Sequence, residues 1–444
     1  MYLGQIAQAV NGSLDRFVNG ERVFGVSTDS RTVKKGEVFV ALHGPNFDGH
    51  GFLADVFRQG ALAAVVDRSV KKTEGPLIHV PDTLHALGDL ASAWRMMLPS
   101  RVVGVTGTNG KTTTQAMISW LLEEKGSLVK PPGSFNNYVG LPRTILSAPP
   151  RTDYLVLELG SNHRGEIARL SQIARPEFAV LTSVSEGHLE GLGDLSGVIE
   201  EKISIFDHLR AGGVGIVHHD PRILSRMKLS RKKFRTFGLH KDADLRATDL
   251  QLDPVRFKVE GVPFRLQLLG EWNIENALAA ISVGVECGMT LEECSERLAN
   301  FRPPKMRMEP LQLGHFTILN DAYNSNPASA RNAVSEFGRM CVGRRFAVVG
   351  DMNELGTRSS YLHRDLGRHI ASMDLDQVAT VGPECRALAE EVPGALHFNR
   401  VEELCERLPD LVQPGDWILL KGSRTIALEK VVRYIGEMVF ESEQ

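Results

Sequence analysis

Short runs of β-branched and aliphatic residues alternate along the chain with longer segments whose apolar positions recur at helical spacing. The short continuous runs are typical of strands buried in a parallel sheet. Ile118, Leu121 and Leu122 illustrate the second kind of segment, which stops at Gly126, a residue suited to ending a helix. The pattern therefore predicts an α/β fold. The main predicted strands are 38–42, 61–66, 102–105, 154–158, 178–181, 316–319, 344–349, 377–381 and 416–420.

The chain is long enough for about three domains, each with its own core. A pair of prolines at 303–304 predicts a linker, because prolines stop a helix and stiffen the chain. We place the domains at residues 1–82, 83–302 and 303–444. Within the middle unit, residues 214–270 contain short alternating runs such as Val255–Val259, followed by a Glu-Gly turn, and these predict a layer of hairpins. Strands and helices alternate again after the linker, which indicates a second open α/β unit.

Composition excludes several classes of function. The charged fraction is 24%, and the net charge of −3 includes no long run of one sign, so a large nucleic-acid surface is not expected. No uninterrupted apolar run approaches the ~18 residues that a membrane span requires. The chain begins without the basic segment of a secretory signal, so we expect a cytoplasmic protein without membrane insertion. The five cysteines lack paired zinc-site spacing and are expected to be reduced thiols: Cys287, Cys294, Cys341, Cys385 and Cys405.

The strongest motif lies between the strand 102–105 and the helix after it. A glycine-rich turn ends in Lys-Thr as the helix opens, which is how proteins bind a nucleotide phosphate. Lys111 supplies a full positive charge, and the Thr112 hydroxyl is placed to hold Mg²⁺. The loop is shorter than a generic P-loop, because Val105 stands where that motif has its first glycine. The predicted nucleotide-binding residues here are Gly107, Thr108, Asn109, Gly110, Lys111, Thr112 and Thr113.

Two further residues follow strands of the same predicted sheet. Glu158 ends a strand where P-loop enzymes place an acid for Mg²⁺, although a strand-end glutamate is more often a solvated terminus. His188 lies in a polar loop at the edge where open α/β sheets bind ligands, although a single histidine is more often structural. The phosphate-binding loop nearby in the sheet favours the metal role for Glu158.

The shortened loop Gly-Thr-Asn-Gly-Lys-Thr (residues 107–112) resembles that of the Mur ligases, the ATP-dependent ligases that build the peptide stem of the bacterial cell wall. At least eight separated strings resemble this family in the right order. The resemblance implies three domains: a small N-terminal α/β domain for the UDP end of the substrate, a central P-loop ATPase domain with a parallel sheet, and a C-terminal Rossmann-like α/β domain.

Substrate residues are implied by three of these strings. Ser30 and Arg31 lie in a Ser-Thr-Asp-Ser-Arg cluster that resembles the UDP-binding module, although such a cluster alone also favours a turn. Asn136 and Asn137 resemble the asparagine pair that lies beside the muramyl-peptide in the family member that adds D-Ala-D-Ala. The Lys-Gly-Ser-Arg string near the C-terminus also resembles that member, and it implies dipeptide contacts from Lys421, Ser423 and Arg424.

The family's nucleotide and metal residues are implied in the same way. The residue pattern predicts a helix over 195–209, which carries Lys202. His188 matches a metal-binding histidine, and Lys202 matches a carbamylated lysine that holds a second Mg²⁺, although Ser204 replaces a glutamate that commonly follows it. Trp272 stands where the adenine-contacting segment usually has histidine, and it could stack on the base. Lys111, His188 and Lys202 are therefore the expected catalytic residues. The remaining expected nucleotide contacts are Asn273, Asn276, Arg307, Asp321 and Asn324.

The expected activity is ATP-dependent ligation of D-Ala-D-Ala to UDP-MurNAc-tripeptide through an acyl phosphate, with Mg²⁺ as cofactor and a monomeric enzyme. Three alternatives stay open, and the first is another Mur-type amide ligase. A folate polyglutamylating ligase shares the central unit, but the N-terminal UDP-type module argues against it. A P-loop switch protein would bind nucleotide without an acceptor and would hydrolyse it slowly, unaffected by D-Ala-D-Ala.

Overall fold

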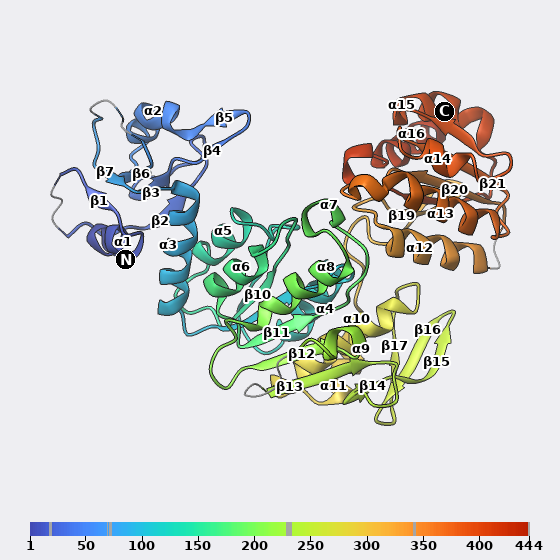
Figure 1. Cartoon of the computed structure of the whole chain (residues 1–444), viewed down its shortest axis with the longest axis horizontal. Coiled ribbons are helices and arrows are strands. Elements are labelled where there is room, and N and C mark those ends of the chain that lie inside the picture. The colour runs from blue at the N-terminus through green and yellow to red at the C-terminus, as the bar shows by residue number, and fades with distance from the viewer. Residues whose placement is uncertain (17–19, 69, 71–72, 228–232, 341–342, 443–444) are drawn as a thin grey trace.

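A computed structural model of the chain describes all residues except 17–19, 69, 71–72, 228–232, 341–342 and 443–444. Three α/β lobes follow one another, with the N-terminal lobe in blue and the C-terminal lobe in red on opposite sides of the central one (Figure 1). Each lobe is built on its own sheet, as the sequence predicts. The exact boundaries 1–82, 83–302 and 303–444 stay a prediction.

The N-terminal lobe has a five-stranded sheet in the order β1-β7-β6-β3-β2. Strands β2 (Gly25–Ser27), β3 (Glu37–Val40), β6 (Ala63–Val66) and β7 (Leu77–His79) are parallel, and β1 (Ser13–Leu14) pairs antiparallel at one edge. Helices α1 (Leu3–Ala9) and α2 (Leu53–Arg58) cover the sheet, and β4 (His43–Gly44) and β5 (Phe47–Asp48) form a small hairpin. Helix α3 (Thr83–Met97) then leads into the central lobe.

The central lobe has a parallel sheet of seven strands in the order β14-β13-β12-β11-β8-β10-β9. Alternate residues of β8 face opposite cores: Val102 packs with α5, α6 and α8, while Val103 and Val105 pack with α4, α10 and α11. Burial on both faces explains the continuous apolar runs. The strands are β8 (Arg101–Thr106), β9 (Leu128–Val129), β10 (Tyr154–Glu158), β11 (Phe178–Leu181), β12 (Val214–His218), β13 (Lys233–Gly238) and β14 (Leu245–Arg246).

Helices flank this sheet on both faces. They are α4 (Lys111–Leu122), α5 (Gly140–Leu146), α6 (Glu166–Ala174), α7 (Leu189–Leu192), α8 (Leu195–Ile203), α9 (Pro221–Leu224), α10 (Trp272–Glu286) and α11 (Leu291–Leu298). A separate antiparallel layer contains β15 (Thr248–Leu252), β16 (Val255–Val259) and β17 (Val262–Arg265). The predicted hairpin layer is therefore right for β15, β16 and β17 and wrong for β12, β13 and β14, three strands that extend the parallel sheet.

The C-terminal lobe has a six-stranded sheet in the order β18-β19-β23-β20-β21-β22. Only β18 (Glu309–Leu313) is antiparallel; the others are β19 (Phe316–Asp321), β20 (Arg345–Gly350), β21 (Gln377–Val381), β22 (Leu396–Phe398) and β23 (Trp417–Lys421). Helices α12 (Pro327–Arg339), α13 (Ser359–Ala371), α14 (Arg386–Ala389), α15 (Val401–Leu411) and α16 (Glu429–Ser442) surround it. This confirms the second open α/β unit.

Two further expectations concern the whole chain. Among the described residues, no helix has the length and apolar character needed to cross a membrane. Cys287, Cys294, Cys385 and Cys405 are free thiols, as expected, and burial raises the pKa of each. Cys341 lies outside the described residues.

Candidate active site

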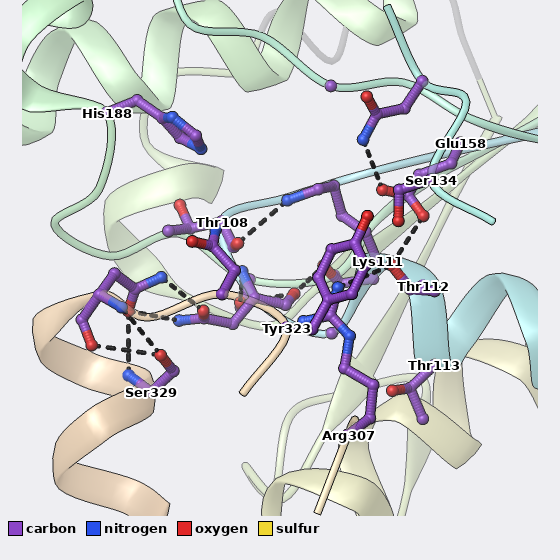
Figure 2. Close-up of a pocket in the computed structure, with 18 of the residues that line it drawn as sticks. Thr108, Lys111, Thr112, Thr113, Ser134, Glu158, His188, Arg307, Tyr323 and Ser329 are labelled. Carbon is purple, nitrogen blue, oxygen red and sulfur yellow. Dashed lines mark hydrogen bonds between the residues drawn. The ribbon is translucent and has the colours of Figure 1, made fainter. Parts of the chain in front are cut away.

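A cavity of about 700 Å³ lies where the central and C-terminal lobes meet. The phosphate-binding loop, the ends of β10 and β11, the first turn of α10 and the start of α12 all line this cavity (Figure 2). Carboxyl ends of parallel strands are where open α/β sheets bind ligands. The cavity therefore brings together residues that are more than 300 positions apart along the chain, from Thr108 to Lys421.

The loop between β8 and α4 has the backbone that phosphate binding requires. Gly107 has φ +150° and Gly110 has φ +80°, a region that favours glycine. A Cβ on Gly107 would lie 2.0 Å from Thr182 Oγ1, and one on Gly110 would lie 2.2 Å from Asn276 Oδ1, so both positions also lack room for a side chain. Gly110 is the N-cap of α4, which directs the positive end of that helix into the cavity.

Lys111 follows directly as the first residue of α4. Its Nζ donates to the Gly107 and Thr108 carbonyl oxygens at 2.9 and 3.1 Å, so the ammonium group lies over its own loop (Figure 2). Burial lowers the pKa of Lys111, although nearby Glu158 favours the charged form. A cation held here is placed to move onto phosphate oxygens that fill the loop.

Glu158 at the end of β10 is buried and lies beside the loop, so it is not a solvated strand terminus. Its Oε2 accepts from the Thr112 hydroxyl at 2.8 Å, and its Oε1 accepts from Asn136 Nδ2, also at 2.8 Å. A hydroxyl and a carboxylate at one point of the cavity are the oxygen ligands that Mg²⁺ prefers. The residues present therefore fit the metal that the sequence suggests.

Arg307 reaches the same point from the linker between the lobes. Its Nη2 donates to Thr112 Oγ1 at 3.2 Å, and its guanidinium lies 4.2 Å from the ring centre of Tyr323. Met306 and Met308, on either side, have φ +59° and +48°, and this strained backbone turns Arg307 toward the cavity. Tyr323 is not among the site residues that the sequence predicts, because only its stacking on Arg307 indicates a role in the site.

The first turn of α10 forms the wall beside Gly110. Asn276 Oδ1 accepts from Thr114 Oγ1 at 3.2 Å, and Asn276 Nδ2 donates to Asn273 Oδ1 at 2.9 Å. Asn273 Nδ2 in turn donates to the Leu269 carbonyl oxygen at 2.7 Å. Trp272 lines the cavity, and its ring folds back over Gly270, where a Cβ would lie 2.3 Å from the indole. The structure thus places Trp272, Asn273 and Asn276 together near the phosphate loop.

Lys202 on α8 is fully buried next to a residue of the cavity wall, Ser161. It does not line the cavity itself, but its Nζ donates to Ser161 Oγ at 2.7 Å, and Ser161 does. Burial, together with the charge of Lys111, lowers the pKa of Lys202 to about 7. Helix α8 ends at Ile203, shorter than the predicted 195–209, because Ser204–Phe206 continues as a 3₁₀ turn.

The C-terminal lobe contributes the loop after β19. Lys421 Nζ pairs with Asp321 Oδ2 at 3.1 Å and also donates to the Asn324 carbonyl oxygen. Burial lowers the pKa of Lys421, while the Asp321 carboxylate favours its charged form. Asp321, Asn324 and Lys421 all line the cavity, but Lys421 is held by its neighbours. Lys421 is therefore placed to stabilise the 321–324 loop, and its position is also compatible with the expected substrate contact.

Two contacts join the C-terminal lobe to central-lobe residues that line the cavity, Asn109 and His188. Asn326, the N-cap of α12, donates from Nδ2 to Asn109 Oδ1 at 2.7 Å. Glu354, from the loop after β20, lies against His188, with its carboxylate on the imidazole Nδ1. The sequence carries a signal for Glu354, an acid shortly after a predicted strand, but nothing in it pairs that acid with His188.

Other expected substrate residues lie outside this cavity. In the N-terminal lobe, the Arg31 guanidinium donates a bidentate hydrogen bond to the Asp29 carboxylate, at 2.9 and 2.7 Å. Arg31, together with the charge of Arg143, lowers the pKa of Asp29 to about 2. Ser30, next to it, also lies in the N-terminal lobe. Asn136 and Asn137 do line the cavity. The structure therefore separates the expected UDP residues from the expected peptide residues.

Ser423 and Arg424 also lie away from the cavity lining. Ser423 is buried, and its Oγ accepts from the Asn353 backbone N–H at 3.0 Å. Arg424 is exposed and pairs with Glu429 Oε1 at 2.9 Å. The assignment of both residues to the dipeptide stays a prediction, and in this structure each already has a partner within its own lobe.

Family models match all three lobes of the chain. The model of the Mur ligase family catalytic domain matches residues 22–95, that of the Mur ligase middle domain matches 105–284, and that of the Mur ligase glutamate ligase domain matches 306–424. Together these matches run from the N-terminal sheet to the loop after β23.

Individual proteins resemble the chain over nearly its whole length. UDP-N-acetylmuramoyl-tripeptide–D-alanyl-D-alanine ligase from Escherichia coli strain K12 is 36% identical over 98% of each chain. The enzyme of that name from Bacillus subtilis strain 168 is 35% identical over 97% of each.

Solved structures agree with these matches. A crystal structure of MurF from Acinetobacter baumannii is 30% identical, with a TM-score of 0.90 over 98% of both chains. The MurF ligase of Thermotoga maritima in complex with ADP is 29% identical, with a TM-score of 0.85 over 95% of this chain and 99% of that one. With these matches on all three lobes, the chain belongs to the Mur ligase family.

Proposed function

We propose that the chain joins D-alanyl-D-alanine to UDP-N-acetylmuramoyl-tripeptide at the expense of ATP. The observation that carries the proposal is the shared cavity, in which the phosphate loop, the Asn136–Asn137 pair and the C-terminal lobe meet. A ligase that activates a carboxylate with ATP and then delivers an amine needs all three reactants at one point. Relatives with this activity by name, 36% and 35% identical over nearly the full length, support the same assignment.

The reaction divides into two transfers. The terminal carboxylate of the tripeptide attacks the γ-phosphorus of ATP, which forms an acyl phosphate and releases ADP. The amine of D-alanyl-D-alanine then attacks the acyl carbon, and phosphate leaves as the amide bond forms. Negative charge develops on phosphoryl oxygens in the first transfer, and positioning and charge stabilisation supply most of its catalysis.

The residues divide this work by position. The loop N–H groups and Lys111 hold the phosphates, and Arg307 adds a second cation from the linker beside Thr112. Thr112 and Glu158 are the oxygen ligands that would hold Mg²⁺, with His188 as a further ligand, and the bound ion would neutralise charge on the transferring phosphoryl group. Trp272, Asn273 and Asn276 form the side of the cavity that fits the nucleotide base.

The N-terminal lobe would hold the other end of the UDP substrate. Ser30 and Arg31 lie at an exposed turn of that lobe, and Arg143 of α5 is near enough to act on Asp29 in the same turn. The guanidinium group of arginine can donate two parallel hydrogen bonds to the oxygens of a diphosphate. The muramyl-peptide would then extend from this turn to Asn136 and Asn137 at the cavity. Arg424 is the proposed partner of the dipeptide carboxylate, which requires it to leave Glu429.

Carbamylation of Lys202 is a further proposal. Carbon dioxide adds only to a neutral amine, and the pKa of Lys202 near 7 leaves much of the amine neutral at physiological pH. The resulting carbamate would replace a cation by the anionic oxygens that Mg²⁺ prefers. A cytoplasmic location and a monomeric enzyme also stay predictions, and sedimentation of the purified chain tests the second.

Phosphate release tests the proposed reaction. We expect release from ATP to depend on UDP-N-acetylmuramoyl-tripeptide and D-alanyl-D-alanine together, with mass spectrometry finding the pentapeptide product. Folate with glutamate serves as the alternative acceptor pair. Release that D-alanyl-D-alanine does not change would contradict the proposal and favour a nucleotide switch, and release with folate would favour the polyglutamylating ligase.

A further inference from the structure

Two loops with the same unusual backbone meet at the boundary between the central and C-terminal lobes. His188, at the start of α7, has φ +54°, and Glu354, after β20, has φ +61°, so both residues occupy the left-handed region that non-glycine residues rarely adopt. The Glu354 carboxylate lies directly on Nδ1 of His188. Backbone strain of this kind persists where the surrounding structure imposes it, and it concentrates at functional sites.

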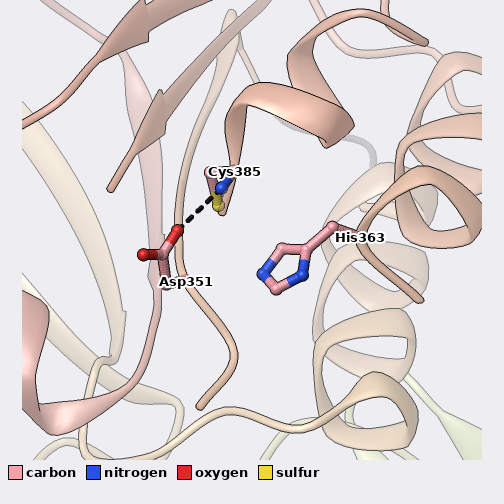
Figure 3. A group of neighbouring side chains, drawn as sticks. All are labelled: Asp351, His363 and Cys385. Carbon is pink, nitrogen blue, oxygen red and sulfur yellow. Dashed lines mark hydrogen bonds between the residues drawn. The ribbon is translucent and has the colours of Figure 1, made fainter. Parts of the chain in front are cut away.

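The loop that carries Glu354 is fixed by a buried group of side chains in the C-terminal lobe. Asp351, His363 and Cys385 are all buried, and their ligand atoms lie within 4.8 Å of one another (Figure 3). The group resembles a metal site, but both nitrogens of His363 are engaged with backbone. Nε2 accepts from the Met352 N–H at 3.0 Å, and Nδ1 lies 2.9 Å from the Ser359 carbonyl oxygen.

The other members of this group hold the same stretch of chain. Asp351 Oδ1 accepts from the Cys385 N–H at 2.7 Å, and the Asn353 N–H donates to Ser423 Oγ at 3.0 Å. Residues 351, 352 and 353 are therefore anchored one after another, immediately before Glu354. The polar atoms of this group hydrogen-bond to the backbone around residues 351–353, and these bonds hold the loop that carries Glu354 in place.

Further contacts join the two loops at the lobe boundary. The Glu190 N–H donates to the Glu354 carbonyl oxygen at 3.2 Å, and Arg358 pairs with Glu186 at 2.6 Å. His188 lies between Glu186 and Glu190 in the chain, so these contacts flank the imidazole. Glu354 can reach His188 only when the C-terminal lobe is docked in this way, since the two residues belong to different lobes.

We infer that Glu354 is a positioning residue, which orients His188 for the metal and makes that orientation depend on docking of the C-terminal lobe. The inference rests on the proposed function, in which His188 is a metal ligand. A metal-binding histidine usually donates its second ring N–H to a carboxylate, which fixes both the tautomer and the ring. With its proton on Nδ1, facing Glu354, His188 presents a lone pair from Nε2 to the cavity that it lines.

The test compares two variants of Glu354. Glu354→Gln keeps an oxygen within reach of Nδ1 but removes the charge, and Glu354→Asn tolerates the left-handed backbone but is too short to reach the ring. Glu390→Gln is the matched control, because Glu390 lies on the same lobe in an exposed ion pair with Arg364. Arg358→Gln removes a lobe contact without touching His188 or Glu354, so it weakens docking alone and should shift His188 toward a mixture of tautomers.

The first readout needs neither metal nor activity. Nitrogen-15 NMR of the full chain labelled at histidine reports which ring nitrogen carries the proton, and the His188 signals are identified by their loss in His188→Gln. With the lobes docked by a non-hydrolysable ATP analogue and UDP-N-acetylmuramoyl-tripeptide, we expect a single tautomer with the proton on Nδ1 in the unmodified protein and in Glu390→Gln. Glu354→Asn should give a mixture of tautomers, and Glu354→Gln should retain the Nδ1 form.

The second readout is the affinity for Mn²⁺ in the presence of ADP, measured by electron paramagnetic resonance. Loss of such an outer carboxylate typically weakens metal binding about 10- to 100-fold, which is the loss expected for Glu354→Asn, with Glu354→Gln between it and the unmodified protein. If Glu354→Asn matches Glu390→Gln in both readouts, the inference is overturned. If His188→Gln itself leaves Mn²⁺ affinity unchanged, the metal role of His188 fails instead, and with it part of the proposed function.

Discussion

The contribution of Lys111 to phosphate binding depends on the residues that position its ammonium group. The loop glycines and the start of α4 put the ammonium group at the point where phosphate oxygens would lie. The preceding loop holds this cation by two carbonyl oxygens, so no acidic side chain has to be displaced when a nucleotide binds.

We expect Lys111→Ala to reduce ligation about 100-fold or more, because removing one donor to a developing negative charge typically costs about that factor. Coupled measurement of ADP release gives the rate, and Lys125→Ala, at the other end of α4, is the control. Turnover above a tenth of the unmodified rate would contradict the role assigned to the phosphate loop.

Lys202 is predicted to carry a carbamate whose formation depends on pH. Burial lowers the pKa of its amine from the ordinary 10.5 to about 7, so the neutral fraction rises as the pH rises through 7. Carbon-13 NMR with labelled carbon dioxide at constant partial pressure should therefore show a carbamate signal that grows from about pH 6 to about pH 8. The signal should be absent in Lys202→Gln.

A functional measurement complements the NMR signal. Lys202→Ala should lose activity, and added acetate should restore part of it by supplying a carboxylate at the vacated position. A bare amine pointing at Ser161 in a structure with metal bound would disprove the assignment, as would full activity of Lys202→Ala.

Residue types and spacing predicted more of the site near the phosphate loop than elsewhere. Gly107–Thr113 and Glu158 lie together because they follow neighbouring strands of one parallel sheet, and that geometry can be inferred from the chain. Asn136 is indicated only by the family resemblance. Glu354 and Tyr323 could not be found in this way. Tyr323 lines the cavity from another lobe, and Glu354 contacts the cavity residue His188 from that lobe. Docking between lobes leaves no period or motif in the sequence.

At the scale of elements, buried strands were the most predictable features. Strand β11 was predicted with its exact bounds, and β10 with both of its ends, because every residue in them is buried. The pattern predicts hairpins at β12 and β13 because glycine and polar residues interrupt their apolar runs. Only the pairing of β12 with β11, and of β13 with β12, places them in the parallel sheet. Helix α8 was drawn too long because Ile205, Phe206 and Leu209 continue its apolar pattern beyond the helix end.

Helix α6 depends on a carboxylate from a neighbouring helix. Glu201 of α8 is buried, and it accepts from the Gly165 and Ile167 N–H groups at 2.6 and 2.7 Å, which lie at the start of α6. The position is favourable, because a carboxylate at a helix N-terminus satisfies unpaired donors and meets the positive end of the dipole. The same helix end follows the 161–163 loop of the cavity wall.

Glu201→Ala should therefore destabilise the protein by about 3 kcal/mol, since two N–H groups, of which that of Ile167 is buried, lose a charged acceptor. Glu200→Ala is a matched control, as the adjacent side chain on the same helix is exposed, and its change should stay within about 0.5 kcal/mol. Urea unfolding followed by circular dichroism measures both. Equal midpoints for the two variants would show that the cap contributes nothing.

The whole molecule divides the proposed reaction among three lobes. The UDP residues lie on the N-terminal lobe, the phosphate loop on the central one, and the Asp321–Asn326 loop on the C-terminal one. Contacts across the last boundary include polar pairs such as Asn326–Asn109 and Arg358–Glu186. Exposed ion pairs contribute only about 0–1 kcal/mol each, so docking of the C-terminal lobe is expected to be weak without ligands.

Bound substrates should shift that balance toward the docked arrangement. ATP would contact the central lobe through Lys111 and the linker through Arg307, so its binding favours the arrangement in which these groups converge. We expect small-angle X-ray scattering of the full chain to show a smaller radius of gyration with a non-hydrolysable ATP analogue and UDP-N-acetylmuramoyl-tripeptide than without them. Arg358→Gln should need more ligand to reach the same compact profile, because it lacks one docking contact, whereas Glu390→Gln should match the unmodified chain. Profiles that coincide with and without both ligands would mean that the lobes do not move, and that the reactants meet in an arrangement the free protein already holds.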